Sequence, residues 1–269
     1  MYLLFKEMSE EEKTHAIQSL MEESTPKPSF FFLVRMSAIM ATLGLLMNNV
    51  SVIIGSMLIA PLLSPILALA LGMEMRERLL IYRSLRTLVR AFFSSLFVSL
   101  ITALLLSRFA ESSGVFSESF NAEILARTEI GILFFLVALV AGMTTAFARM
   151  KEELNDTLPG TAIAIALVPP IANIGIGIAT LNGFIASRSF LLFLLNAVGI
   201  IIGALFIFSL MGIRRKKRIA KKAAIRADRK LEKMKEEHAE EQAEEKIESL
   251  KESLGIEKIE NRNEEKKRG

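Results

Sequence analysis

The chain has 269 residues, 52% of them hydrophobic, and a mean hydropathy of +0.42, above the apolar share of about 45–50% usual in soluble domains. It contains no cysteine, which excludes disulfides, thiolate catalysis and cysteine-based metal sites. Residues 214–269 hold 19 of the 33 Lys/Arg and 14 of the 29 Asp/Glu. The net charge of +4 comes from this one segment. The positive charge is therefore no argument that the protein binds nucleic acid.

Six stretches are long and apolar enough to cross a bilayer, whose hydrocarbon core takes about 20 residues of helix. They are residues 30–48, 50–72, 88–107, 130–148, 159–180 and 189–213. Only a short Asn48-Asn49 turn separates the first two spans, and these asparagines are expected to cap a helical hairpin. The sequence thus predicts an all-α membrane protein with six transmembrane helices and the lipid bilayer as its first partner.

Lysines and arginines in the short loops predict the orientation, because cytoplasmic loops carry an excess of both. The loop after the second span has four arginines between residues 76 and 86, and five basic residues at 214–218 follow the sixth span. The loop at 108–129 has four glutamates and only two arginines. We therefore expect a multi-pass protein of the cell membrane, with both termini in the cytoplasm and this loop outside.

Two charged segments flank the membrane domain of residues 29–213. Residues 1–28 are expected to form a short amphipathic helix that ends before Pro26 and Pro28. Its apolar stripe consists of Ala16, Ile17, Leu20 and Met21. We expect a solvated surface helix, with docking against the membrane domain as the alternative. Residues 214–269 predict a charged cytoplasmic helical tail.

An internal repeat relates the two halves of the membrane domain, about residues 30–107 and 130–213. A shift of 105 positions aligns Gly55 with Gly160, Pro65 with Pro170 and Gly72 with Gly177. Such matches are informative because glycine and proline both weaken a helix interior. Each half has three spans, so the second half enters the membrane from the opposite side. The pattern predicts two inverted three-helix repeats, as in many secondary transporters; a duplication that serves only packing is the alternative.

Prolines lie near the midpoints of the second and fifth spans, the middle span of each repeat. Pro61 and Pro65 interrupt the second span, and Pro169 and Pro170 the fifth. An interior proline costs about 3 kcal/mol, and the carbonyls that it frees must find a helix, a side chain, a water or a ligand. Since discontinuous helices form binding sites in transporters, both breaks are candidate solute sites. Kinks that serve only packing are the alternative.

The segments that carry these glycines and prolines resemble a known family. They read SAIMATLGLLMNNVSVIIGSMLIAPLLSPILALALG from Ser37 and GTAIAIALVPPIANIGIG from Gly160. Both are similar to segments of the domain-of-unknown-function family 389, a family of prokaryotic integral membrane proteins. The resemblance covers about residues 30–213. It implies a membrane protein and brings with it no settled activity and no catalytic residues.

Polar residues within the spans complete the candidate site. No aspartate or glutamate lies within the predicted spans, which disfavours carboxylate proton pathways and intramembrane enzymes; we expect no enzyme, metal or cofactor. Arg90 lies just inside the third span, so Arg35 is the one clear charge within a span. Arg35 is expected to snorkel to the cytoplasmic interface; an anion contact is the alternative. The candidate solute-binding residues are Arg35, Ser56, Pro61, Ser64, Pro65, Thr161, Pro169, Pro170, Asn173 and Asn196.

The leading functional interpretation is a secondary transporter or channel-like carrier for a small polar solute, anions included. One repeat would rock against the other around the paired proline breaks. The alternative is a non-transporting membrane scaffold or signalling protein whose charged tail binds partners. A homo-oligomer is compatible with both interpretations. In the sixth span, Gly199 and Gly203 form a small-xxx-small motif, which predicts close helix packing.

Overall fold

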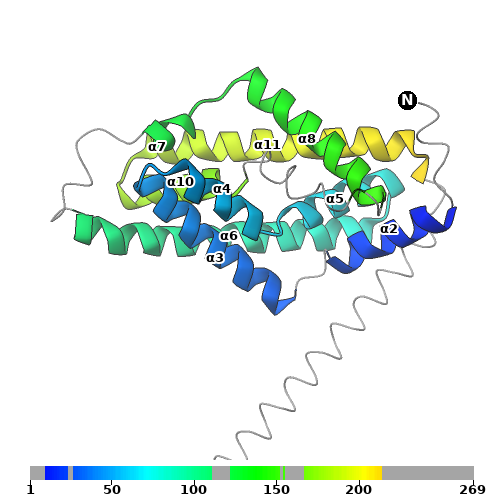
Figure 1. Ribbon diagram of the computed structural model, residues 1–269, viewed down its shortest axis with the longest axis horizontal. Coiled ribbons are helices and arrows are strands. Elements are labelled where there is room, and N and C mark those ends of the chain that lie inside the picture. The colour runs from blue at the N-terminus through cyan, green and yellow to red at the C-terminus, as the bar shows by residue number, and fades with distance from the viewer. Residues whose placement is uncertain (1–9, 24–26, 111–121, 152–153, 155–166, 214–269) are drawn as a thin grey trace, which may run out of the picture. The chain divides into compact units, whose positions relative to one another are not determined.

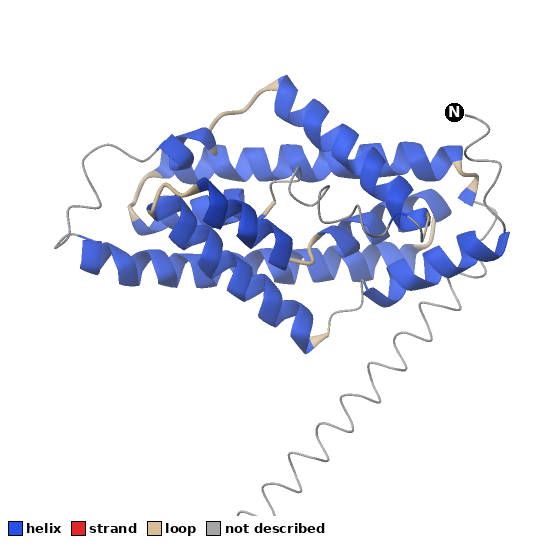
Figure 2. Cartoon of the chain, viewed as in Figure 1, coloured by secondary structure: helices blue, strands red, loops and turns tan. Residues whose placement is uncertain are grey.

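The structure is a computed structural model that describes residues 10–23, 27–110, 122–151, 154 and 167–213. Every regular element in these ranges is a helix (Figures 1 and 2). The longer elements are α2 (Glu10–Glu23), α3 (Pro28–Leu46), α4 (Val50–Ile59), α5 (Leu63–Met75), α6 (Arg78–Ala110), α8 (Ile132–Met150), α10 (Val168–Ala179) and α11 (Gly183–Leu210), and a short α7 spans Ala122–Ala126. The predicted tail at 214–269 lies outside the described residues.

Several of these helices are suited to a bilayer. Among the described residues, α3, α6, α8 and α11 are each long and apolar enough to cross it, and α4 with α5 makes a fifth candidate span bent by 53°. The predicted second span is therefore broken. Helix α10 is apolar but short, and the first part of the predicted fifth span lies outside the described residues. The described residues confirm the all-helical fold, and their apolar helices are compatible with a multi-pass membrane protein.

Three corners between consecutive helices share one geometry. In each, a residue with positive φ follows the helix: Asn48 (51°), Arg76 (53°) and Leu181 (54°). The next backbone N–H then donates to the carbonyl of a glycine five residues earlier, as in Glu77 to Gly72 (2.9 Å) and Asn182 to Gly177 (2.8 Å). The last two corners lie 105 positions apart. The first confirms the predicted Asn48-Asn49 turn, with Asn49 capping α4 through the N–H of Val52.

Glycines at these corners allow the following helix to approach. A Cβ on Gly177 would lie 2.7 Å from the backbone nitrogen of Ala186, and a Cβ on Gly72 would lie 3.1 Å from that of Ile81. The aligned pair Gly72 and Gly177 therefore serves the close approach after both corners, because an added Cβ would overlap Ala186 at Gly177 and would crowd Ile81 at Gly72.

Close packing of α8 on α11 also depends on glycine. A Cβ on Gly199 would lie 2.8 Å from the Cβ of Ala138, and one on Gly203 would lie 2.9 Å from the backbone nitrogen of Met143. From the α8 side, Gly142 meets the backbone of Ile200. The small-xxx-small prediction for α11 is confirmed: these residues let the two backbones touch.

Helix α2 is docked, so the expectation of a solvated surface helix is wrong. Its apolar stripe is buried, with Ile17 fully inaccessible and Leu20 only 1% exposed. The stripe belongs to an apolar cluster that also contains residues from α5 and from the ends of α8 and α11. Amphipathic spacing shows that a helix has an apolar face. It does not show whether that face packs on another helix or stays at the surface.

Candidate solute site at the paired half-helices

The chain is broken between α4 and α5 at Pro61, one of the two prolines predicted to interrupt the second span. Helix α4 ends at Ile59, Ala60 is extended (φ −78°, ψ 117°), and α5 begins at Leu63. Pro65 is then the third residue of α5. A proline costs little there because the first N–H groups of a helix have no partner within it. The expected kink at Pro65 is replaced by a break that centres on Pro61.

The second half-helix begins in the same way. Helix α10 starts at Val168, 105 positions after Leu63, and it carries Pro169 and Pro170 in its first turn. In Figure 1, α5 and α10 both begin near the middle of the helical assembly and run towards opposite ends. Residues next to the two starts, among them Leu62 and Leu167, belong to one apolar cluster. The candidate Thr161 lies outside the described residues.

Hydroxyl groups satisfy carbonyls in the last turns of α4. Pro61 has no N–H to offer the carbonyl four residues earlier, and Ala60 has already left the helical conformation. The hydroxyl of Ser37 on α3 donates to the carbonyl oxygen of Ser56 (2.6 Å). The candidate Ser56 in turn donates its hydroxyl to the carbonyl of Ile53 (2.6 Å). Neighbouring side chains therefore stabilise the end of α4, as the membrane environment demands.

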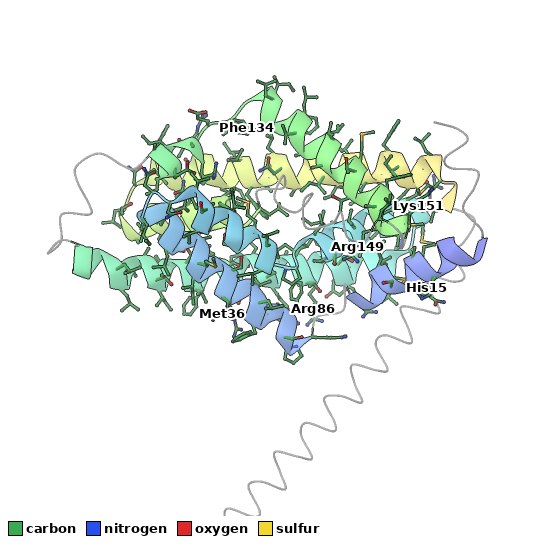
Figure 3. All side chains as sticks on the ribbon, viewed as in Figure 1. His15, Met36, Arg86, Phe134, Arg149 and Lys151 are labelled. Atoms are coloured by element: carbon green, nitrogen blue, oxygen red, sulfur yellow. The ribbon has the colours of Figure 1, made fainter. Side chains whose placement is uncertain are left out.

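A guanidinium group lies at the start of α5. Arg149, in the last turn of α8, donates from Nη2 to the Oγ of Ser64 (3.1 Å), the second residue of α5 (Figure 3). The N-terminus of a helix carries a partial positive charge and exposed N–H groups. The guanidinium and the helix N-terminus therefore bring N–H donors to the same place, and both are groups that bind anions in proteins.

Arg149 was not among the candidates because it directly follows the predicted fourth span, which ends at residue 148. A signal was present. Ala138, Gly142 and Thr145 follow one another at spacings of four and three residues, and Arg149 comes four residues later. This is the buried stripe of α8. Helical spacing therefore predicts that Arg149 faces the neighbouring helices rather than water.

Asn173 has a different set of neighbours from Ser64. This residue of α10 is fully buried, and its Nδ2 donates to the carbonyl of Ile124 (3.0 Å) and to the Oγ of Ser189 on α11 (2.8 Å). Its Oδ1 has no hydrogen-bond partner in the described part of the chain. Asn173 thus joins α10, α11 and the segment at 122–128, which contains α7.

Further polar contacts hold the 122–128 segment in place. The N–H of Glu123 donates to the Oδ1 of Asn48 at the first corner (3.2 Å), and the Nε of Arg188 donates to the carbonyl of Thr128 (3.1 Å). The hydroxyl of Ser189 donates to the carbonyl of Arg127 (3.2 Å). Both halves of the membrane domain therefore contribute to holding this segment.

The other candidates occupy separate places. Arg35 is exposed on α3, and its Nε donates to the Oγ of Ser94 on α6 (2.9 Å), as expected for a side chain that reaches outward. Asn196 is buried within α11, at 6% exposure. The structure thus brings together Ser64 with Arg149, and Asn173 with Ser189, as two distinct polar groups.

Two polar features were not anticipated. Ser99 of α6 lies 2.7 Å from the hydroxyl of Thr42 and donates to the carbonyl of Ala172 on α10 (2.9 Å), while Thr42 also lies within reach of the Ala38 carbonyl. Two hydroxyl protons serve three contacts, so this junction of α3, α6 and α10 can redistribute its hydrogen bonds. In addition, Glu74 is buried in the last turn of α5. It was not expected within a helix because the predicted span ended at residue 72, whereas α5 continues to Met75.

Comparisons with known proteins bear on the identity of the chain. The family described as "Domain of unknown function (DUF389)" matches residues 57–202, more than half of the sequence. An uncharacterised protein, MJ0678, of Methanocaldococcus jannaschii is 31% identical over 198 residues, which are 71% of this chain and 58% of that relative. The chain therefore spans less than two thirds of that relative. No solved structure matches. The chain belongs to the DUF389 family of membrane proteins.

Proposed function

We propose that the chain is a secondary transporter or channel-like carrier of a small anionic solute, built from six spans in two inverted repeats. Three features 105 positions apart support the repeat: the starts of α5 and α10, their first-turn prolines, and the corners that follow them. In Figure 1, α6 and α11, which follow these corners, run in opposite directions. Half-helices that begin near the middle of such a repeat are where transporters bind their substrates.

The single observation that carries the proposal is the guanidinium of Arg149 beside Ser64 at the N-terminus of α5. A break that served only packing would need its carbonyls satisfied, which the Ser37 hydroxyl helps to do. It would not need a cation where the helix dipole is already positive. Substrate anions in transporters bind at such half-helix N-termini. We therefore assign the solute-binding role first to Arg149 and Ser64.

A thermal-stability screen on the purified full chain tests this assignment. Chloride, sulfate, inorganic phosphate and short carboxylates are compared at constant ionic strength. We expect at least one anion to raise the unfolding temperature, because a ligand at 100 times its Kd stabilises by about 2.7 kcal/mol. Arg149→Gln should abolish that shift. The matched control is Lys151→Gln, which removes the same charge from a side chain that lies over the Phe147 ring and should keep it.

Two outcomes would count against the carrier. If no anion stabilises the protein, the site has no anionic ligand of these classes, and the scaffold alternative gains support. If Arg149→Gln responds to the anion as strongly as the unchanged protein, the solute binds elsewhere. Transport itself is then measured in proteoliposomes with the anion that the screen identifies, where Arg149→Gln should reduce uptake at least tenfold while the protein remains inserted.

The proposed orientation is tested by cysteine labelling, since the chain has no native cysteine. Met47 lies at the first corner and is 62% exposed, and Arg78 is exposed at the start of α6. In intact cells, Met47→Cys should react with a membrane-impermeant thiol reagent, whereas Arg78→Cys should react only after the cells are opened. The reverse pattern would invert the orientation, and labelling of both from outside would contradict the number of spans.

A further inference from the structure

A row of polar side chains runs along the exposed flank of α6. Tyr82, Arg86, Arg90 and Ser94 follow at intervals of four residues, which places them on one side of the helix. Tyr82 is 63% exposed, and both arginines are exposed. Arg35 of the adjacent helix α3 reaches this row through its hydrogen bond to the Oγ of Ser94. We call Arg35, Arg86 and Arg90 the arginine face.

The positive charge of the arginine face is uncompensated by the helices that carry it. Neither α3 nor α6 contains an aspartate or glutamate. Three guanidinium groups on two adjacent helices, without an acidic side chain from either, present donors that suit a phosphate.

Apolar side chains surround the arginine face. On α3, Phe32 (60%) and Met36 (39%) are exposed, and on α6 the exposed residues next to the arginines include Val89 and Phe93 (62%). Figure 3 labels Met36 of α3 and Arg86 of α6 along the same edge of the view. A soluble anion would gain nothing from this apolar surface. A ligand that combines an anionic head with acyl chains would use both parts.

The position of the arginines along α6 agrees with a headgroup. Seventeen uncharged residues separate Arg90 from Arg108, which amounts to about 25 Å of helix and approaches the hydrocarbon thickness of about 30 Å. Arg90 and Arg86 therefore lie at the level where the hydrocarbon meets the headgroups. Tyr82, one turn further out, is of the type enriched at this interface.

We infer that the arginine face binds the phosphate of an anionic phospholipid, whose acyl chains lie against the exposed apolar residues of α3 and α6. The lipid belongs to the leaflet at the end of the domain where α5 meets α6, the cytoplasmic leaflet in the proposed orientation. This site is independent of the solute site, because it is formed on the outer flank and involves neither Arg149 nor Ser64.

Lipid titration of the purified full chain in neutral detergent tests the inference. The probes are phosphatidylglycerol, phosphatidylcholine with the same acyl chains, and inorganic phosphate, each followed by native mass spectrometry and by the unfolding temperature. We expect phosphatidylglycerol to bind more tightly than phosphatidylcholine. Arg86→Gln with Arg90→Gln should weaken phosphatidylglycerol binding by about fivefold for each arginine removed, and Arg35→Gln should add a further loss.

The control is Lys151→Gln, which removes one charge at the end of α8 and should leave the preference for phosphatidylglycerol unchanged. Equal binding of the two lipids, or an unaltered preference in the Arg86 and Arg90 double variant, would overturn the inference. If inorganic phosphate alone reproduces the stabilisation and competes with the lipid, the surface binds a soluble anion and the lipid assignment is wrong. Unfolding temperatures measured without added lipid show whether each variant is folded.

Discussion

Gly203→Ala is expected to destabilise the membrane domain, although alanine normally favours a helix over glycine by about 1 kcal/mol. The added Cβ would meet the backbone of α8, 2.9 Å from the nitrogen of Met143 and against the carbonyl of Leu139. Backbone atoms within a helix cannot rotate aside, so α8 and α11 must separate. Overpacking of this kind costs about 1–3 kcal/mol or more, and a loss of folded protein is the expected result.

Gly183→Ala is the matched control for that substitution. Gly183 is the first residue of the same helix, and nothing lies within 4 Å of the Cβ that would be added. The substitution should leave the unfolding temperature unchanged or raise it slightly. Both variants are compared by thermal unfolding in detergent and by the yield of monodisperse protein. If Gly203→Ala is as stable as Gly183→Ala, the close contact between α8 and α11 does not exist.

Asn173→Ala is expected to release the 122–128 segment while the rest of the domain stays folded. The substitution removes the donor to the Ile124 carbonyl (3.0 Å) and the contact to Ser189. A buried carbonyl left without a donor costs about 1–3 kcal/mol, which corresponds to a roughly 5- to 150-fold increase in local opening. The cost to global stability should be smaller, because the unpartnered Oδ1 of Asn173 is removed as well.

Hydrogen exchange followed by mass spectrometry measures this release. Peptides that cover residues 122–131 should exchange faster in Asn173→Ala, whereas those from α8 and α11 should change little. Asn182→Ala serves as the control, because the hydrogen bond that Asn182 accepts comes from the N–H of Ile185 in α11 (3.1 Å) and not from the 122–128 segment. Unchanged exchange of residues 122–131 in a folded Asn173→Ala protein would show that other contacts hold the segment. Weakened anion binding in this variant would make Asn173 a ligand as well.

The positions of the helices follow largely from local sequence properties. Apolar runs place α3, α6, α8 and α11 because the cost of exposing an unsatisfied backbone in lipid leaves helix as the available structure. The asparagines at 48 and 49 predicted the first corner because asparagine tolerates positive φ and caps the helix that follows. The spacing of Gly199 and Gly203 predicted a close helix contact, since small residues at four-residue spacing share one face.

Where the helices begin and end was harder to predict from the sequence. The predicted loop at 73–87 is mostly helix, because α6 begins at Arg78 and continues to Ala110. Hydropathy locates the apolar part of a membrane helix and says nothing of its polar extension into the interface. Pro65 and Pro170 show a related limit, because both lie in the first turn of a helix and neither lies in its interior. The residue type predicts a disturbed helix, while the position of the break relative to the proline depends on the neighbouring segments.

Partners across the fold were decided only by the tertiary structure. The sequence places Arg149 near a span end, where arginine normally faces water, yet its guanidinium contacts Ser64, 85 positions earlier. The apolar stripe of α2 likewise predicts that something covers it, and only the packed structure identifies α5 and α8 as its neighbours. Periodicity and charge are properties of a short segment, whereas a hydrogen bond between distant segments depends on how whole helices pack. The sequence by itself therefore determined a helical membrane protein, and the packing of those helices determined which polar groups meet.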